Sequence, residues 1–341
     1  MNLNYLEVEE TVRRALDEDI GAGDVTTALT VSSSAVSNAR IIAREEGIIA
    51  GLPVAAICFR LVAESYSAGH MTVIKRVRPP HTAAVRIEGL PQAGKPIRIT
   101  AKHLGKPAVN VTGGPVAPRK SSERESNLAF RAELSDGAMV QSGDIIAEIT
   151  GPTVAILTAE RTALNFLQRL SGIATRTARL VSLVEGTGAV VMDTRKTTPG
   201  LRSLEKYAVR RGGGRNHRFG LYDAVLIKDN HIEAAGGIAE AIEAARADAS
   251  HLMKIEAEAE TLAQVETALE AGADIILLDN MSPADLKKAV KACRGRALTE
   301  ASGNVTEKNI LEVAKTGVDM ISVGALTHSV DALDLSLEIT G

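Results

Sequence analysis

The second half of the chain predicts an α/β fold with parallel strands, and two features of the sequence support this. From residue 188 onward, short apolar runs alternate with helical patterns, which is the order of repeated β–α units. Each run also ends in a polar residue or a glycine. Such residues converge on one mouth of a βα-barrel, whereas most would be spread apart in an open doubly wound sheet, so the barrel is favoured.

The expected elements follow from the period of the apolar residues. Strands are expected at 189–192, 224–227, 252–255, 275–278, 297–299 and 320–323. Helices are expected at 200–211, 237–248, 261–271, 283–293, 306–316 and 331–338. In the first half, helices are expected at 5–18, 53–64 and 158–185, and strands at 38–50 and within 131–150, around a turn at Ser142–Asp144.

The segment 66–127 differs from its surroundings. From His70 to Arg131 there are twelve Lys or Arg residues against three Asp or Glu, and the prolines are dense. We interpret it as an inserted excursion, partly β or irregular. A solvated basic insertion without a catalytic role is the simpler interpretation.

Composition excludes several classes of protein. The chain has 341 residues, a net charge of -3 and only four Phe, four Tyr and no Trp, which argues against nucleic-acid binding. Cys58 and Cys293 are far apart, so no disulfide framework or zinc site is expected, and a reducing cytoplasm is the expected compartment. Neither a signal peptide nor a membrane-spanning run is expected.

Basic residues are concentrated in one part of this slightly acidic chain. Between Arg195 and Lys228 there are nine Lys or Arg and two Asp or Glu. Arg195 and Lys196 follow the first predicted strand, His217 and Arg218 follow three glycines, and Lys228 ends the next strand. This pattern predicts a pocket for a small, highly charged anion, and both phosphates and carboxylates fit it.

Carboxylates end two successive strands of the same predicted barrel. Glu256 and Glu258 lie two residues apart, so on a strand they point to one side, and Asp279 ends the next run. Glu258 and Asp279 could hold Mg²⁺, bond the hydroxyls of a ribose, or neutralise the basic mouth. The residues alone do not separate these three roles.

Two glycine-containing loops follow the last two predicted strands. Ser302–Gly303–Asn304 and Gly324 each lie between a strand and a helix. Backbone amides at a helix N-terminus bind phosphate, and the last two loops of a βα-barrel are a common phosphate site. P-loop, HExxH and GxGxxG patterns are absent from the sequence.

These motifs together resemble the type II phosphoribosyltransferases, specifically the quinolinate phosphoribosyltransferase family. The matching segments are 18–27 (EDIGAGDVTT), 158–165 (TAERTALN), 171–175 (SGIAT), 193–231, 278–281 (LDNM), 301–304 (ASGN) and 322–328 (SVGALTH). The resemblance covers about 11–64 and 131–341. The segment 66–127 departs from the family pattern, and Ala257 and Ala259 are smaller than the residues usual there.

The resemblance implies an N-terminal α/β sandwich joined to an incomplete, seven-stranded α/β barrel. We expect the sandwich at 1–157, with room for part of the C-terminal end, and the catalytic barrel at 158–341. The implied activity makes nicotinate mononucleotide, pyrophosphate and CO₂ from quinolinate and phosphoribosyl pyrophosphate, with Mg²⁺ as cofactor. A homodimer or larger homo-oligomer is implied, with no nucleic-acid or membrane partner.

The resemblance also assigns site residues. The quinolinate pocket is expected to contain Arg161 from the partner subunit together with Thr194, Arg195, Lys196, His217 and Arg218. Phosphoribosyl pyrophosphate and its metal are expected near Lys196, Lys228, Glu258, Asp279 and His328, with Glu258 and Asp279 on the metal, directly or through water. Its 5′-phosphate is expected at Ser302, Gly303, Asn304 and Gly324. The catalytic group would be Lys196, Lys228, Glu258 and Asp279.

Two other functions compete with this one. A protein with the same scaffold can act on another substrate, as in the similar protein of molybdate-transport operons, but the complete Arg195–Lys196 and His217–Arg218 set favours quinolinate. A non-enzymatic anion- or RNA-binding protein that uses the basic insertion is the third hypothesis. Glu258 and Asp279 argue against it, because a polyanion binder gains nothing from carboxylates.

Overall fold

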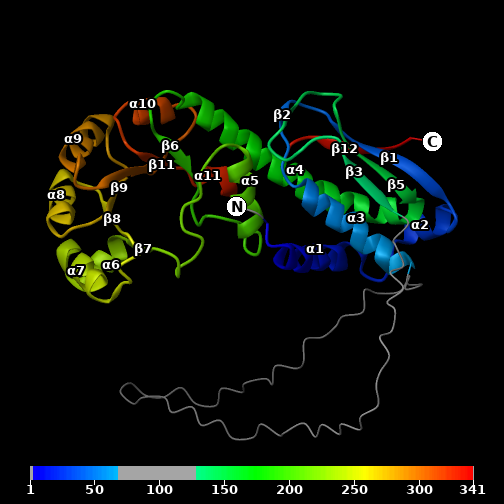
Figure 1. Ribbon diagram of the computed structural model, residues 1–341, viewed down its shortest axis with the longest axis horizontal. Coiled ribbons are helices and arrows are strands. Elements are labelled where there is room, and N and C mark those ends of the chain that lie inside the picture. The colour runs from blue at the N-terminus through cyan, green and yellow to red at the C-terminus, as the bar shows by residue number, and fades with distance from the viewer. Residues whose placement is uncertain (1–2, 68–127, 341) are drawn as a thin grey trace, which may run out of the picture.

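The computed structural model describes residues 3–67 and 128–340. Two sheets lie at opposite ends of the molecule, and the long helix α4 (Thr153–Leu183) runs from one to the other (Figure 1). The predicted insertion at 66–127 falls, except for its first two residues, outside the described part of the chain. None of the described helices is long and apolar enough to cross a membrane.

The N-terminal unit is a sheet covered by helices on one face. Its elements are α1 (Tyr5–Ile20), α2 (Val25–Thr30), β1 (Val36–Ala43), β2 (Gly47–Ile48), α3 (Leu52–Ser67), β3 (Ala129–Ala132), β4 (Met139–Val140) and β5 (Ile145–Pro152). The antiparallel sheet has the order β12-β1-β5-β3. Along β1, Ala39, Ile41 and Ala43 are buried, while Arg40 on the other face pairs with Glu148 at 3.0 Å. This alternation is typical of a sheet with one solvated face.

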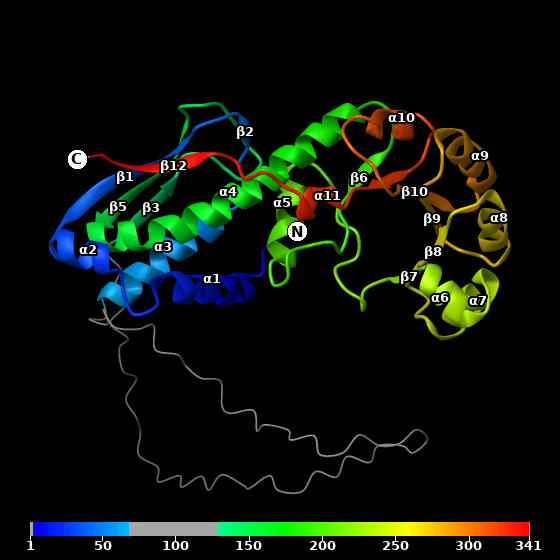
Figure 2. The ribbon, with the colours of Figure 1, turned by 180° about the vertical axis from the view of Figure 1, so that it is seen from behind.

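The last described element of the chain is a strand and not the helix that we predicted. We expected a helix at 331–338, but Leu335–Thr340 forms strand β12, which pairs antiparallel with β1. The apolar residues Leu335, Leu337 and Ile339 recur with a period of two, which is the strand period, and this pattern outweighs the helical propensity of leucine. The C-terminal end therefore lies in the N-terminal sheet (Figure 2).

The second unit is an open barrel of parallel strands. Its strands are β6 (Val190–Met192), β7 (Val225–Ile227), β8 (Ile255–Ala259), β9 (Ile275–Asp279), β10 (Leu298–Ser302) and β11 (Met320–Ser322). They are ordered β6-β11-β10-β9-β8-β7, and every neighbouring pair is parallel. Because β6 and β7 are both edges, the barrel does not close. The predicted fold class, an incomplete α/β barrel with an N-terminal sandwich, is confirmed.

Two details of the barrel differ from expectation. The seventh strand implied by the resemblance is reduced to a single parallel bridge between Met192 and Arg215. The strand expected at 252–255 begins only at Ile255, because residues 250–253 form a turn in which the Met253 amide donates to the Ser250 carbonyl at 2.8 Å. The strand therefore carries Glu256 and Glu258 within it, both buried.

Helices surround the strands on the outside of the open barrel (Figure 1). They are α5 (Arg202–Arg211), α6 (Asp229–Ala235), α7 (Ile238–Asp248), α8 (Leu262–Glu270), α9 (Pro283–Cys293), α10 (Ile310–Ala314) and α11 (Ala325–His328). Their starts follow capping rules: Thr261 and Gln264 form a capping box on α8, and Ser282 caps α9 ahead of Pro283. The helix expected at 306–316 is shorter than predicted, because only residues 310–314 form α10.

Helix α4 joins the two units into one structure. It packs against α3 and β5 in the N-terminal unit and against α5, β6 and α11 in the barrel. Both Ala159, near its start, and Ile173, further along, have no exposed surface. The domain boundary that we expect at 157/158 falls inside this helix, so it divides an uninterrupted element, and it stays a prediction.

Candidate active site

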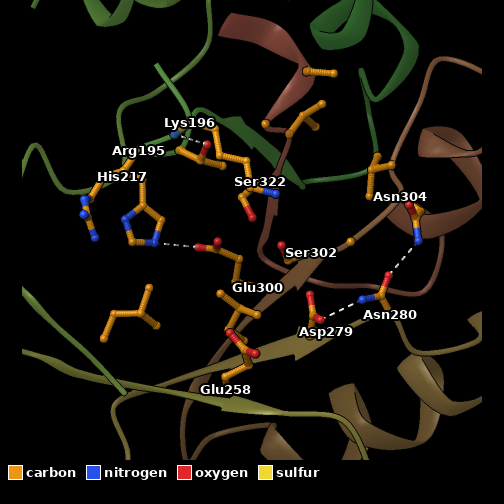
Figure 3. A pocket seen from close by; sticks show the side chains of 18 of the residues that line it. Arg195, Lys196, His217, Glu258, Asp279, Asn280, Glu300, Ser302, Asn304 and Ser322 are labelled. Carbon is orange, nitrogen blue, oxygen red and sulfur yellow. Dashed lines mark hydrogen bonds and ion pairs between the residues drawn. The ribbon is translucent and has the colours of Figure 1, made fainter. Parts of the chain in front are cut away.

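A cavity of about 730 Å³ opens at the carboxyl ends of the barrel strands. Of the fourteen residues predicted for the site, thirteen line the cavity: Thr194, Arg195, Lys196, His217, Arg218, Lys228, Glu258, Asp279, Ser302, Gly303, Asn304, Gly324 and His328. They come from loops and strand ends far apart in the sequence. Figure 3 shows Arg195, Lys196 and His217 on one side of the cavity and Asn280 and Asn304 on the other.

Arg161 is the exception. It lies on α4 and is exposed, and it is not among the residues that line the cavity. Helix α2 packs against α4, and its Val25 and Leu29 are 70% and 81% exposed. Within one chain, Arg161 is therefore separate from the other thirteen residues.

The loop that carries Arg195 and Lys196 is held by a charged network behind it. Arg169 pairs with the fully buried Glu205 at 2.6 Å and donates to the Thr198 hydroxyl at 2.6 Å. Glu205 in turn accepts the Thr198 amide at 3.1 Å. The Thr327 hydroxyl donates to the Lys196 carbonyl at 2.6 Å. These contacts thus fix the backbone that carries the exposed Arg195 and Lys196 side chains.

His217 is the most constrained of the predicted residues. Its Nδ1 accepts the Arg218 amide at 2.7 Å, so the ring proton sits on Nε2, which faces Glu256 at 3.1 Å. Glu300 lies 3.7 Å from the same nitrogen. Figure 3 shows its carboxylate facing the His217 ring. Two carboxylates therefore lie beneath the cationic side of the cavity.

Glu300 lines the cavity and was missed by sequence reasoning. It precedes Ser302 by two residues on β10, so the period of the strand places both on the inward face. That signal was available, because the same argument identified Glu256 and Glu258 on β8.

Burial sets the ionisation of this cluster. It raises the pKa of Glu300 to about 7, and the neighbouring charge of Glu256 adds to the rise. For His217, burial lowers the pKa, but the hydrogen bond to Glu256 and the charges of Glu300 and Glu256 outweigh it, and the pKa is raised. Protonation of the ring would place a second proton on Nδ1, where it would meet the N–H of Arg218, so this amide opposes the charged form.

Arg218 completes the cationic side. Burial, followed by the charge of Arg195, lowers the pKa of its guanidinium. Its Nη1 reaches the Ala224 carbonyl at 3.3 Å, while its Nε finds no partner among the described residues. A partly buried guanidinium whose Nε donor is buried and unpaired among the described residues is suited to a carboxylate or phosphate of a ligand.

The far side of the cavity combines carboxylates, amides and glycines. Lys228 pairs with Glu258 at 2.6 Å. Asn280 donates to Asp279 at 2.7 Å and accepts from Asn304 at 2.9 Å. The side chains thus form two polar groups, and Figure 3 shows the hydrogen bonds that join Asp279, Asn280 and Asn304.

Gly303, in the first predicted phosphate loop, is required by its backbone conformation and by close packing, whereas the exposed Lys196 side chain could move away from a Cβ on Gly324 in the second loop. Gly303 has φ +90°, and a Cβ there would lie 2.2 Å from Asn280 Oδ1. A Cβ on Gly324 would lie 3.0 Å from Lys196 Cδ. Gly324 precedes α11 as expected, but Ser302–Asn304 does not lie at a helix start. A turn capped by Asn309, which accepts the Thr306 amide at 2.7 Å, separates it from α10.

Among the described residues, two clusters of three side chains are close enough together to hold a cation, and the clusters differ in chemistry. Glu258, Glu260 and Asp279 offer only oxygen atoms, the ligands that Mg²⁺ prefers, so these residues fit the predicted ion. The group of His217, Glu256 and Glu300 fits poorly. Binding of a metal at Nε2 would move the ring proton to Nδ1, which already accepts the Arg218 amide.

Fold and cavity define a class of protein: a βα-barrel that binds a small polyanionic ligand at the carboxyl ends of its strands. Comparison with protein families makes the assignment specific. The model of the quinolinate phosphoribosyl transferase N-terminal domain matches residues 85–171, and that of the C-terminal domain matches 173–338. The chain belongs to the quinolinate phosphoribosyl transferase family.

Individual relatives agree with this assignment. The chain is 37% identical over 334 residues to the nicotinate-nucleotide pyrophosphorylase [carboxylating] of Mycobacterium leprae, covering 97% of this chain and 96% of that protein. It is 35% identical over 352 residues to a quinolinate phosphoribosyltransferase [decarboxylating] of Nicotiana tabacum, covering 98% of this chain and 82% of that protein. The structure of the Francisella tularensis nicotinate-nucleotide pyrophosphorylase matches with a TM-score of 0.78 and 36% identity, over 99% of this chain and 98% of that one.

Glu300 makes the stability of the protein depend on pH. Its pKa rises from 4.5 to about 7 on folding. Between these two pH values the folded state therefore binds more protons than the unfolded state. Stability contributed by Glu300 is therefore present at low pH and lost as pH rises through about 7. His217, with a pKa raised from 6.5, acts in the same direction. We expect the urea midpoint to fall less between pH 5 and 8 in Glu300→Gln than in the parent.

The control for this measurement is Glu312→Gln, which changes an exposed carboxylate on α10. It should follow the parent curve. An identical pH dependence of the parent and Glu300→Gln would contradict the ionisation assigned to the buried cluster.

Proposed function

We propose that this protein transfers the phosphoribosyl group of phosphoribosyl pyrophosphate to quinolinate and releases CO₂. The products are nicotinate mononucleotide and pyrophosphate. One observation carries the proposal: a single cavity places a cluster of cations on one side and carboxylates with two glycine loops on the other. Family membership supports the same reaction.

The cationic side suits the dicarboxylate. Quinolinate carries two adjacent carboxylates, and Arg195, Lys196 and Arg218 offer donors to both. Arginine gives a planar fork to a carboxylate and lysine a point charge. His217 closes this side, with the polar atoms of its ring directed at the Arg218 amide and at Glu256. We propose that Thr194, whose hydroxyl accepts the Lys196 amide at 3.0 Å, shapes the loop.

The opposite side suits phosphoribosyl pyrophosphate. We propose that Ser302, Gly303, Asn304 and Gly324 bind the 5′-phosphate, where backbone amides can approach closely. Lys196 and His328, which flank Gly324, and Lys228 would face the pyrophosphate. Glu258 and Asp279 would meet the ribose hydroxyls or the metal ion. The ribose would then lie between the two sides, with its anomeric carbon toward the pyridine ring.

The chemistry needs positioning and charge stabilisation more than a covalent nucleophile. The bond between the anomeric carbon and pyrophosphate breaks, and its electrons leave with pyrophosphate, whose developing charge faces Lys196 and Lys228. The pyridine nitrogen donates its pair to the anomeric carbon and becomes a cation. Glu258 and Asp279 order the ribose or the metal ion for this displacement.

The decarboxylation follows from the new positive charge. The electrons of the bond to the adjacent carboxylate move onto the ring carbon, where the pyridinium stabilises them, and CO₂ leaves. A proton then replaces CO₂ on that carbon. Arg195 and Arg218 hold the second carboxylate throughout and keep the ring in position.

We propose Mg²⁺ as the cofactor, held by Glu258 and Asp279 directly or through water. When bound, the ion would neutralise part of the charge on the departing pyrophosphate. Lys228 pairs with Glu258, and Asn280 donates to Asp279. Both partners would have to share their carboxylate with the ion.

We further propose that the active form is a homodimer or larger homo-oligomer in which Arg161 serves the cavity of a neighbouring subunit. Arg161 is exposed and absent from its own cavity, and the exposed Val25 and Leu29 of the adjacent α2 offer an apolar surface beside it. A cytoplasmic location, without membrane or nucleic-acid partners, is part of this proposal.

The reaction itself is tested by a product assay. Purified protein with quinolinate, phosphoribosyl pyrophosphate and Mg²⁺ should form nicotinate mononucleotide and CO₂. Nicotinate, which lacks the second carboxylate, is the control substrate and should give little product, because one end of the cationic side would be left without its partner. Equal turnover of nicotinate, or none of quinolinate by folded protein, would contradict the proposal.

Sharing of sites between subunits is tested by complementation. Arg161→Ala and Lys228→Ala should each abolish activity, and their one-to-one mixture after subunit exchange should regain about a quarter of the parent activity, since half of the dimers would be mixed and each would hold one intact site.

The matched control mixes Lys228→Ala with Glu258→Ala. Both residues lie in one cavity of one chain, so no mixed dimer can contain an intact site. Rescue in this control, or no rescue in the first mixture, would rule out the proposed contribution of Arg161 from a partner.

A further inference from the structure

The dicarboxylate side of the cavity rests on a buried ion pair that takes no part in the reaction described above. Asp193, which follows β6, pairs with Lys206 of α5, and neither side chain has any exposed surface. Burial raises the pKa of Asp193 and lowers that of Lys206, while their mutual attraction opposes both changes. A buried pair of this kind is costly to form, which raises the question of what it holds in place.

The ion pair holds the backbone of His217 from both directions. Asp193 Oδ1 accepts the His217 amide at 2.9 Å, and Lys206 Nζ donates to the His217 carbonyl at 3.0 Å. Every polar backbone atom of this residue is thus bound to one member of the pair.

Asn216 extends the same arrangement by one residue. Its Nδ2 donates to Asp193 Oδ2 at 2.6 Å and to the Lys206 carbonyl at 2.8 Å. Lys206 Nζ also lies 5.1 Å from the centre of the Phe219 ring, beyond Arg218. The buried pair therefore contacts the chain immediately before and after His217 and Arg218.

The segment needs this support because it has little of its own. Residues 212–214 are glycines, and the following strand is reduced to the bridge between Met192 and Arg215. Sheet hydrogen bonds therefore do not fix the positions of His217 and Arg218 as they do for Glu258 or Ser302. Asp193 also lies two residues before Arg195. One buried residue therefore connects the segment of Arg195 and Lys196 with the segment of His217 and Arg218.

We propose that Asp193, Lys206 and Asn216 form a positioning unit that sets the binding of the dicarboxylate and leaves the phosphoribosyl pyrophosphate side unaffected. This inference rests on the proposed function of the cavity. None of the three residues is among those that line the cavity, so each acts through His217 and Arg218.

The variants separate positioning from a merely structural role. Lys206→Met and Asp193→Asn each leave a buried charge without its partner and should lower the melting temperature. The pair Asp193→Asn with Lys206→Met removes both charges, and its melting temperature should recover toward the parent value. Its KM for quinolinate should nevertheless remain raised at least about tenfold, because small displacements of binding groups are costly. The KM for phosphoribosyl pyrophosphate should change less than about twofold.

Asn216→Ala provides an independent variant that keeps the ion pair. Loss of its hydrogen bonds should raise the KM for quinolinate about three- to tenfold, again without effect on phosphoribosyl pyrophosphate. Lys291→Met, which removes an exposed lysine on α9, is the control and should match the parent in both constants. If the paired variant does not fold, Asn216→Ala decides the question.

Two results would overturn the proposal: equal rises in the two KM values, or unchanged KM values in folded variants. Failure of the proposed function is distinguishable, because the parent protein would then form no product. In that case calorimetric titration with benzene-1,2-dicarboxylate, a probe of the cationic side alone, tests the positioning unit directly. Weaker binding in the paired variant and in Asn216→Ala supports the unit, and binding equal to the parent refutes it.

Discussion

The parallel arrangement of the barrel strands is the constraint on which the site depends. Because all six strands run in one direction, their carboxyl ends lie at one edge of the sheet, and the loops that follow them face a common space. Residues separated by more than a hundred positions, such as Thr194 and His328, therefore line one cavity. An antiparallel sheet of the same strands would have divided these side chains between two edges.

The cavity concentrates charge, and ion pairs in which at least one member is fully buried hold that charge in place. The Arg169–Glu205 pair supports the loop that carries Arg195 and Lys196, and the Asp193–Lys206 pair supports the segment of His217. Such pairs add little net stability, because desolvation offsets their attraction, but they tolerate few alternative arrangements. Pre-organised charge of this kind favours a reaction in which an anion departs and a cation forms.

The sequence predicts much of this arrangement because the signals are local. Lys228 and Asp279 each directly follow or end an apolar run, so their position at the mouth follows from strand period and the barrel rule alone, whereas Glu258 lies within β8, beyond the run expected at 252–255. The open barrel and the family are confirmed as well. Functional roles of individual residues, the metal ion and the oligomer stay predictions.

What the sequence does not predict depends on contacts between distant segments. Strand β12 is wrongly predicted as a helix although its apolar residues recur with a period of two, and its partner β1 lies about three hundred positions away in the sequence. The single bridge between Met192 and Arg215 has no run of apolar residues to signal it, because three glycines precede Arg215 in the sequence. Arg161 lies outside the cavity of its own chain, and no local pattern indicates where a residue on a long helix acts.

The measurement that tests the two-sided cavity most directly is a crystal structure of the protein with benzene-1,2-dicarboxylate and phosphoribosyl pyrophosphate bound together. The account predicts the two carboxylates against Arg195 and Arg218 and the 5′-phosphate against the loops of Gly303 and Gly324, with the ribose between them. A dicarboxylate bound at the glycine loops, or a 5′-phosphate bound at Arg195 and Arg218, would contradict it.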